Sequence, residues 1–186
     1  MIDTEKIKRS ATAIIEAIGE NPRREGLADT PRRMAAMYEE FFSGLGQDPV
    51  EVLATGFEEN HKEMVVLRDI PFISVCEHHF LPFFGTADIG YVPNGRVVGA
   101  SKLARALDIL ARRPQIQERL TTQIADTIVA ALSPEGVGVV LSAEHMCMSL
   151  RGVKKLGSKI VTKASRGTIK CHEATRREFD SLLREG

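Results

Sequence analysis

Residues 136–148 read GVGVVLSAEHMCM, and this stretch decides the class of fold. Apolar and small residues recur at every second position, which predicts a β-strand with one buried face. That face carries Val137, Val139, Leu141, Ala143, His145 and Cys147. Side chains two residues apart on a strand lie about 7 Å apart. The pattern therefore predicts that His145 and Cys147 lie side by side at the end of a buried strand.

Both flanks of this strand mix helical and extended segments. Residues 63–96 are rich in β-branched and aromatic side chains and are interrupted by proline and glycine, which predicts strands joined by turns. Pro114 separates two amphipathic runs, and Ser101 is placed to cap the first of them. We expect helices over 101–113 and 116–132, a strand over 158–164 and a charged helix over 173–184. Because these elements lack a regular βαβ rhythm, they favour an α+β fold over a doubly wound sheet.

The first 60 residues have a different, helical character. Apolar residues between Thr4 and Ile18 recur at helical spacing. Thr30-Pro31 predicts a second helix with Thr30 as N-cap and Pro31 at its first position. A short helix is expected after Asp48-Pro49. We therefore divide the chain into an N-terminal helical segment, residues 1–60, and a sheet-containing domain, residues 61–186.

Composition excludes several classes of protein. The chain has 186 residues, and Lys+Arg and Asp+Glu both count 25, so no net charge indicates nucleic acid or an anionic membrane as a partner. No apolar run approaches the roughly 20 residues of a membrane span. The N-terminus lacks the apolar core of a signal peptide, and three cysteines form no disulfide framework. These features predict a cytoplasmic protein.

A second cluster of metal-binding residue types lies about seventy residues before Cys147. Cys76-Glu77-His78-His79 places a thiol and an imidazole three positions apart, so that one tight turn can present both to the same ion. Zinc accepts sulfur at about 2.3 Å and nitrogen at about 2.0–2.1 Å. With Cys147 as a third ligand, one tetrahedral position stays open for water, as in catalytic zinc sites.

Two alternatives to this open site remain. Either cysteine alone is more often a small buried hydrophobic residue than a ligand. Cys171-His172 offers a fourth ligand that would close the site and make the zinc structural. The chain contains no second short-spaced pair of the zinc-finger type, which argues against the closed site.

Other residues near these clusters suit proton transfer and anion binding. His78 and His145 are candidates for acid–base groups near neutral pH, although either could be an ordinary surface or core histidine. Ser101, Lys102 and Arg105 place a hydroxyl and two cations at a predicted helix N-terminus, where phosphate is favoured. Arg151 and Arg33 are further phosphate candidates. Gln117 and Glu118 suit the edge of a guanine, but composition alone favours a solvated helix face.

Taken together, these motifs resemble those of the GTP cyclohydrolase I family along nearly the whole chain. The resemblance rests on Thr30-Pro-Arg-Arg33, Val75-Cys-Glu-His-His79, Gly90-Tyr-Val-Pro-Asn-Gly95, Ser101-Lys-Leu-Ala-Arg105, Arg113-Pro-Gln-Ile-Gln-Glu-Arg-Leu120, His145-Met-Cys147, Arg151-Gly152 and Thr175-Arg-Arg-Glu-Phe179. It implies the tunnelling fold, an antiparallel sheet with helices packed on one side, preceded by an N-terminal helical segment. It also implies a homodecamer of two stacked five-membered rings, with active sites between subunits.

The resemblance further implies a role for each matching position. Cys76, His79 and Cys147 match the ligands of one zinc ion per subunit, whose water attacks C8 of the guanine. His78 matches the group that protonates N7, His145 a proton-transfer group, and Ser101 a hydroxyl that assists the sugar rearrangement; Glu77 is counted with these catalytic residues. Glu118 and Gln117 match guanine recognition, and Lys102, Arg105, Arg151 and Arg33 match triphosphate binding. Ala36 stands where many relatives carry a lysine.

The implied reaction converts GTP and water into 7,8-dihydroneopterin triphosphate and formate, the first step of tetrahydrofolate and pterin synthesis. Two other functions remain open at this point. One is a tunnelling-fold relative that acts on another purine or pterin. The other is a structural-zinc interaction module.

Overall fold

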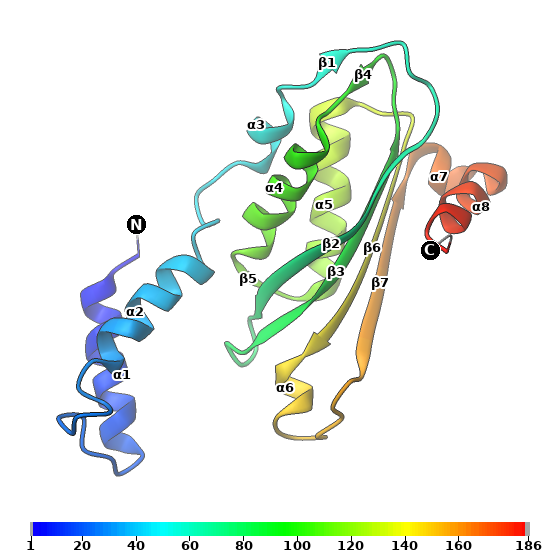
Figure 1. The fold of residues 1–186 in the computed structure, drawn as a ribbon. Coiled ribbons are helices and arrows are strands. Elements are labelled where there is room, and N and C mark those ends of the chain that lie inside the picture. Colours follow the sequence, from blue (N-terminus) through cyan, green and yellow to red (C-terminus); the bar gives the residue numbers. More distant parts are fainter. Residues whose placement is uncertain (1, 185–186) are drawn as a thin grey trace. The chain divides into compact units, whose positions relative to one another are not determined.

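The strand predicted over residues 136–148 is present as β6 (Gly136–His145), inside a five-stranded sheet. Its neighbours are β3 (Pro82–Val92) and β7 (Lys159–Arg166), and β2 (Val65–Cys76) pairs with the far side of β3, all antiparallel. A two-residue strand, β5 (Pro114–Gln115), adds to β2 in parallel at Val75 and Cys76. Figure 1 shows this long, curved sheet. The α+β prediction is confirmed.

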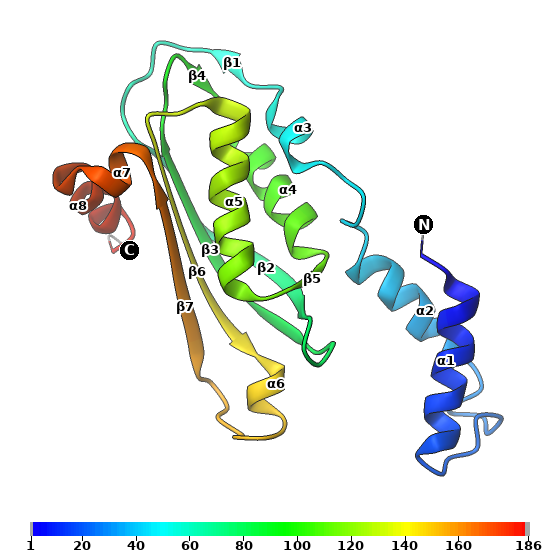
Figure 2. The ribbon, with the colours of Figure 1, turned by 180° about the vertical axis from the view of Figure 1, so that it is seen from behind.

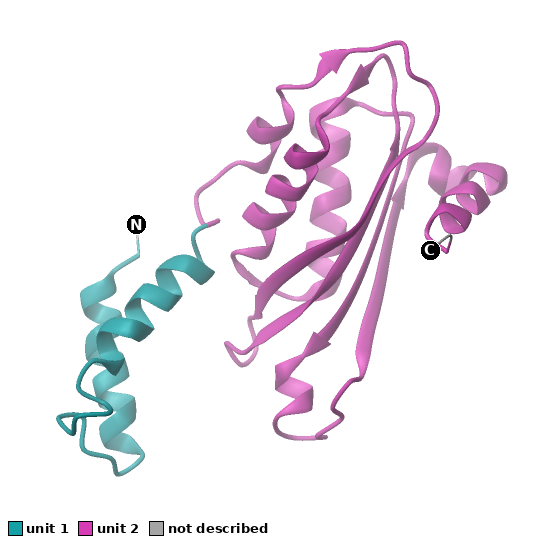
Figure 3. Ribbon diagram, in the orientation of Figure 1, with its two compact units in different colours: residues 1–43 teal, residues 44–186 magenta. Residues whose placement is uncertain are grey.

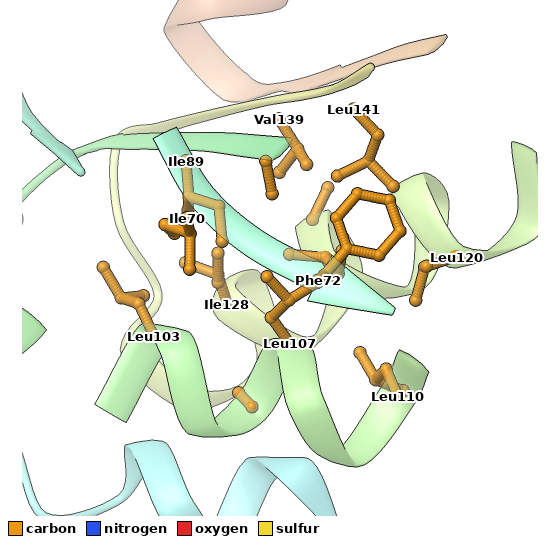
Figure 4. Packing of buried hydrophobic residues seen from close by; sticks show 14 of the residues in the cluster. Ile70, Phe72, Ile89, Leu103, Leu107, Leu110, Leu120, Ile128, Val139 and Leu141 are labelled. Atoms are coloured by element: carbon orange, nitrogen blue, oxygen red, sulfur yellow. The ribbon is translucent and has the colours of Figure 1, made fainter. Parts of the chain in front are cut away.

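Helices α4 (Ala100–Ala111) and α5 (Gln117–Leu132) cover one face of this sheet (Figures 1 and 2). Figure 4 shows the side chains that meet there: Phe72, Ile89 and Leu141 from the strands, and Leu107, Leu120 and Ile128 from the helices. All of these side chains are buried. Burial of each large apolar side chain contributes about 1.5–3 kcal/mol, so this layer holds the helices on the sheet. The expected arrangement is confirmed for the four long antiparallel strands, with α4 and α5 packed on one side.

The C-terminal helix α8 (Glu173–Leu182), which α7 (Gly167–Cys171) joins to β7, attaches to the opposite face at one end of the sheet. Its fully buried Phe179 packs over Gly90 and Gly138, which are direct partners on β3 and β6. A Cβ atom built on either glycine would lie 2.7 Å from the Phe179 ring. Glycine is therefore required at both positions to admit the ring.

Short elements complete this part of the chain. Helix α3 (Pro49–Leu53) packs on α4 and α5. Strands β1 (Phe57–Glu58) and β4 (Arg96–Val97) form a separate two-stranded sheet. A single helical turn, α6 (Met146–Ser149), follows β6 directly.

The computed structural model describes residues 2–184, which fall into two compact units that divide between Ser43 and Gly44 (Figure 3). The first unit holds α1 (Thr4–Ala17) and α2 (Thr30–Phe41). Residues 44–60, including α3, belong to the second unit by their contacts; the functional division at residue 60 stays a prediction. Across residues 2–184, no helix is both long enough and apolar enough to cross a membrane.

Three local predictions were wrong. The strand ends at His145, so Cys147 lies on α6, because the β3 partner of the next residue would be proline, which has no N–H to donate. Helix α4 begins at Ala100 with Gly99 as its N-cap, so Ser101 lies inside the first turn. Helix α2 begins at Thr30 itself, with Asp29 as its N-cap.

Candidate active site

A tight turn at the end of β2 presents Cys76 and His79. The Cys76 N–H donates to the Leu81 carbonyl at 2.9 Å, and the Phe80 N–H donates to the Cys76 carbonyl at 2.9 Å. Phe80 adopts a left-handed conformation with φ of 54°, which non-glycine residues rarely do. These contacts close the turn, and they bring the thiol and the imidazole together, as the spacing predicted.

Cys147 joins this pair from α6. The Sγ atoms of Cys76 and Cys147 lie 4.0 Å apart, and the ligand atoms of Cys76, His79 and Cys147 all lie within 4.8 Å of one another. Two thiolates on one tetrahedral zinc ion would be about 3.8 Å apart, whereas a disulfide requires about 2.05 Å. The separation and the donor set both fit a metal ion. Within residues 2–184 no other group of three His, Cys, Asp or Glu side chains gathers in this way.

The cluster is open to solvent on one side. Cys76 is buried, Cys147 is half-buried and His79 is exposed. Burial, together with the neighbouring Cys76 thiol, raises the pKa of the Cys147 thiol. A cation bound between the sulfurs reverses this effect, because thiolate is the form that ligates metal.

Arg151 lies against the cluster from the loop after α6. Its Nη1 is 3.1 Å from His79 Nε2 and donates to the Cys147 carbonyl at 3.5 Å. A guanidinium at this place gives a fixed positive charge beside the open side of the cluster. The position suits an anionic group of a ligand, and the role in phosphate binding stays a prediction.

His145, the last residue of β6, is also near the cluster but is buried, with 7% of its surface exposed. Its ring stacks on Phe83 at a centroid distance of 4.5 Å and an interplanar angle of 7°. Burial lowers the pKa of His145, and the nearby Glu118 carboxylate opposes this effect. The imidazole is therefore neutral at pH 7 and able to accept a proton.

The Gln117 side chain is buried and lies against His145. Its Oε1 is 2.8 Å from His145 Nε2, and its Nε2 donates to the Leu141 and Ile160 carbonyls. The next residue, Glu118, is exposed. Of the two residues predicted to meet a guanine, only Glu118 presents its side chain to solvent.

Glu77 is paired with Arg119, a residue that the sequence did not single out. Two hydrogen bonds, of 2.5 and 3.1 Å, join the guanidinium of Arg119 to the two carboxylate oxygens of Glu77. This bonding lowers the pKa of Glu77, so its carboxyl is ionised at neutral pH. His78, the next residue, is exposed, with its ring 6.3 Å from that of His79. Arg119 was part of the motif Arg113–Leu120, but no role was predicted for it.

Another group of predicted residues is not brought to the metal cluster. Ser101, Lys102 and Arg105 lie in the first turns of α4, whereas the end of α4 leads through β5 to Cys76. Figure 1 shows α4 running from the β4 end to the β5 end. Ser101 lies about 15 Å along the helix axis from the last residue of α4. Arg33 lies in the first unit, where it bonds Asp29 and Thr30.

The alternative fourth ligands are also distant. Cys171 and His172 follow β7 at its Arg166 end, whereas the Lys159 end pairs with Glu144 beside the cluster. Seven steps of strand span about 23 Å. The closed structural-zinc site is therefore not formed within this chain.

Comparison with known proteins identifies the family. The family model described as GTP cyclohydrolase I matches residues 7–184. A GTP cyclohydrolase 1 of Dehalococcoides mccartyi strain 195 is 57% identical over 187 residues, which cover 100% of this chain and 99% of the relative. A GTP cyclohydrolase 1 of Halalkalibacterium halodurans is 57% identical over 184 residues, covering 98% of each chain. One of Streptococcus agalactiae serotype V strain 2603 V/R is 53% identical over 187 residues, covering 100% of each.

A solved structure is also similar in part. The crystal structure of the archaeosine synthase QueF-Like in the apo form matches 56% of this chain and 93% of its own, with a TM-score of 0.45 and 21% identity. The assignment rests instead on the full-length matches in sequence. The chain belongs to the GTP cyclohydrolase I family.

Proposed function

We propose that this chain is a zinc-dependent hydrolase that converts GTP and water into 7,8-dihydroneopterin triphosphate and formate. The observation that carries the proposal is the cluster of Cys76, His79 and Cys147, whose ligand atoms lie within 4.8 Å of one another. His79 is exposed to solvent, and the chain belongs to the GTP cyclohydrolase I family. Three ligands with an open side suit a catalytic ion better than a structural one.

Cys76, His79 and Cys147 would hold one zinc ion per chain. When bound, zinc polarises a water molecule and lowers its pKa towards neutrality, which supplies a nucleophile for C8 of the guanine ring. The protein holds the donors in place through the closed turn at Cys76 and through α6.

Proton transfer falls to the histidines beside the cluster. His78 is exposed next to the ligand His79 and would give a proton to N7 as the ring opens. His145 is neutral and held against Phe83, and it would take up and return a proton in the later steps on the ribose. Glu77, held as a carboxylate by Arg119, would keep this part of the turn in place for them.

Recognition of GTP would use charges around the cluster. The exposed Glu118 carboxylate suits the N1–H and amino group of guanine, which adenine does not offer. Arg151, beside His79, suits a phosphate oxygen.

Ser101, Lys102 and Arg105 would come from neighbouring subunits of a homodecamer, and Arg33 would add a further triphosphate contact. The separation of α4's first turns from the cluster supports this arrangement. So do the sheet edges: within residues 2–184, β7 has no partner on its outer side, and β5 covers β2 only at Val75 and Cys76. Unpaired edges of this kind favour pairing with another chain.

The test is a GTP assay that measures formate release and, after oxidation, pterin fluorescence. It uses purified protein of known zinc content, with His78→Ala and Cys147→Ala as variants and Cys171→Ala as the matched cysteine control. We expect both products from the wild type and the control, loss of zinc in Cys147→Ala, and zinc retention without turnover in His78→Ala.

Two further substrates test the specificity. ATP lacks the guanine edge that Glu118 would bind, and 7-deaza-GTP lacks the nitrogen that His78 would protonate, so neither should release formate. A fully metallated wild type that makes neither product from GTP would overturn the proposal.

A further inference from the structure

The amide of Gln117 is fully engaged inside the protein. Gln117 is the first residue of α5, and only 1% of its surface is exposed. Its Nε2 lies 2.9 Å from the Ile160 carbonyl, 3.1 Å from the Leu141 carbonyl and 3.1 Å from Thr162 Oγ1. The side chain therefore joins α5 to both β6 and β7 and has no polar atom left for a ligand.

These contacts determine which way the amide faces. Carbonyl oxygens only accept hydrogen bonds, so the atom next to Leu141 and Ile160 must be the NH₂ group. The hydroxyl contacts agree. The Thr121 hydroxyl donates its hydrogen to the backbone carbonyl of Gln117 at 2.7 Å. In the 2.6 Å bond between Thr121 and Thr162, the Thr162 hydroxyl is therefore the donor. The Thr162 oxygen then accepts from Gln117, as the carbonyls do.

The orientation of the amide determines the proton position on His145. Gln117 Oε1 faces His145 Nε2 at 2.8 Å and can only accept, so Nε2 must carry the hydrogen. In the neutral ring the other nitrogen, Nδ1, is then bare. Stacking on Phe83 holds the plane of the ring, and within this plane a flipped ring would place a carbon in place of Nε2 against Gln117 Oε1 and lose the hydrogen bond.

We propose that Gln117 is a positioning residue that holds His145 in its Nε2–H tautomer and so makes Nδ1 the nitrogen that takes up and returns the proton. This role replaces a direct contact of the Gln117 side chain with guanine. Its consequence for turnover rests on the function proposed above; the tautomer itself does not. Fixing the tautomer of a catalytic histidine through its second nitrogen is worth large factors in rate, up to about 10⁴ in serine proteases.

The first test is solid-state ¹⁵N NMR of holoprotein labelled with ¹⁵N-histidine, with His145→Asn used to assign the His145 signals. Neutral His145 is expected to show a protonated Nε2 and a bare Nδ1. The opposite assignment, or an equal mixture of tautomers, would overturn the proposal. This readout needs neither GTP nor turnover, so it is separate from a failure of the proposed function.

The second test compares Gln117→Met with Thr162→Val. Methionine keeps the length of the side chain but removes the acceptor for His145, whereas Thr162→Val removes one contact of the same amide and leaves its bond to His145. Gln117→Met should lose the tautomer preference and lower kcat about 10- to 100-fold, with KM for GTP changed by no more than about twofold. Thr162→Val should keep the wild-type tautomer and a kcat within about threefold of wild type.

Other results would contradict the assignment. A Gln117→Met variant whose KM for GTP rises while kcat is unchanged would mean that Gln117 contacts the substrate. Equal losses of kcat in both variants, with the wild-type tautomer kept in both, would reduce Gln117 to a packing residue. If Gln117→Met does not fold, the wild-type spectrum still decides the tautomer.

Discussion

The turn that carries His78 and His79 is joined to helix α5 by the ion pair of Glu77 with Arg119. Both side chains are partly exposed, at 33% and 42%, and exposed ion pairs contribute little to global stability. The geometry is bidentate, however, and one partner lies between two of the proposed metal ligands in the sequence. Loss of the Glu77–Arg119 pair should therefore disturb the conformation of the turn that carries the metal ligands, while the free energy of unfolding changes little.

We predict that Arg119→Ala weakens zinc binding about 10-fold, the scale found for residues that support metal ligands, and changes the melting temperature little. Competition with a chromophoric chelator measures the Kd of zinc. Lys8→Ala is the matched control, because it breaks the exposed pair of Glu5 and Lys8 on α1. An Arg119→Ala variant with the zinc affinity of Lys8→Ala would contradict the prediction.

Glu144 holds both ends of the loop that contains Arg151. Its Oε1 accepts from the Ser149 hydroxyl at 2.6 Å and from the Gly157 N–H at 2.9 Å. These two bonds lower the pKa of Glu144 below its ordinary value of 4.5. A group with a lowered pKa in the folded state stabilises the protein above the unfolded value, and this contribution is lost as the pH falls through the folded value.

The hydrogen bonds from Ser149 and Gly157 to the Glu144 carboxylate should therefore persist down to pH 4.5 and weaken only at lower pH, where the carboxylate becomes protonated. The amide signal of Gly157, followed by TROSY NMR, is expected to titrate with a midpoint below 4.5. Glu144→Gln should abolish this titration, because the amide carries no charge to lose. A midpoint at or above 4.5 in the wild type would show that the two hydrogen bonds do not favour the ionised carboxylate.

At this scale the sequence predicted residue types better than residue contacts. Cys76 and His79 could be found because metal ligands need particular atoms at short spacing, and Cys147 because a histidine stands two residues before it. Arg119 could not, since an arginine on a helix face is most often solvated and nothing in the sequence indicates its distance to Glu77. Gln117 was predicted, together with Glu118, to meet a guanine; its burial could not be predicted, because it depends on how α5 meets β6 and β7.

At the scale of elements, helix α8 is attached to the sheet by one aromatic ring over two glycines. We predict that Gly138→Ala lowers the free energy of unfolding by about 1–3 kcal/mol, because the new methyl group would lie 2.7 Å from the Phe179 ring. Phe179→Ala should cost about 3–5 kcal/mol, as expected for a fully buried ring. Urea unfolding followed by circular dichroism at fixed protein concentration measures both changes.

The double variant tests the cause. If the clash with the ring is the reason, Gly138→Ala should cost almost nothing once Phe179 is alanine, so that the two changes are far from additive. Val161→Ala, on the same face of the sheet and 65% exposed, is the control and should be nearly neutral. Additive losses would mean that Gly138 is required for the strand and not for the helix.

Element types followed from sequence periodicity, whereas element ends depended on partners. The alternation through residues 136–148 continues past the true end of β6, because it does not reveal that Pro82 on β3 is unable to extend the ladder. Helix α4 likewise begins one residue before Ser101, with Gly99 as its N-cap and without a side-chain cap. Both predicted ends differ from the observed ends by one to three residues. The first error nevertheless assigned Cys147 to a strand, although it lies on helix α6.

At the scale of the whole molecule, one chain holds the metal cluster at one end of α4 and the proposed phosphate residues Lys102 and Arg105 at the other. No periodicity in the sequence indicates this separation, because it depends on the direction in which α4 crosses the sheet. Two clusters at opposite ends of α4 can form one site only if a second copy of the chain brings its α4 cluster to the metal cluster of the first.

This arrangement predicts complementation between two inactive variants. Cys147→Ala lacks the metal cluster but keeps the α4 cluster, whereas Lys102→Ala with Arg105→Ala keeps the metal and lacks the phosphate contacts. Co-expressed in equal amounts with different tags and purified through both, the mixed oligomers should recover about a quarter of the wild-type kcat per chain, because about one site in four receives an intact half from each neighbour.

The same mixture separates shared sites from sites within one chain. Each variant alone, and the two mixed after separate purification without subunit exchange, should stay inactive. Mixed oligomers that contain both tags and one zinc ion for every two chains, but release no formate from GTP, would mean that Lys102 and Arg105 serve the cluster of their own chain, which would require α4 to lie elsewhere. Recovery of activity requires residues on two copies to meet one GTP molecule, so it would establish the shared site without a structure of the oligomer.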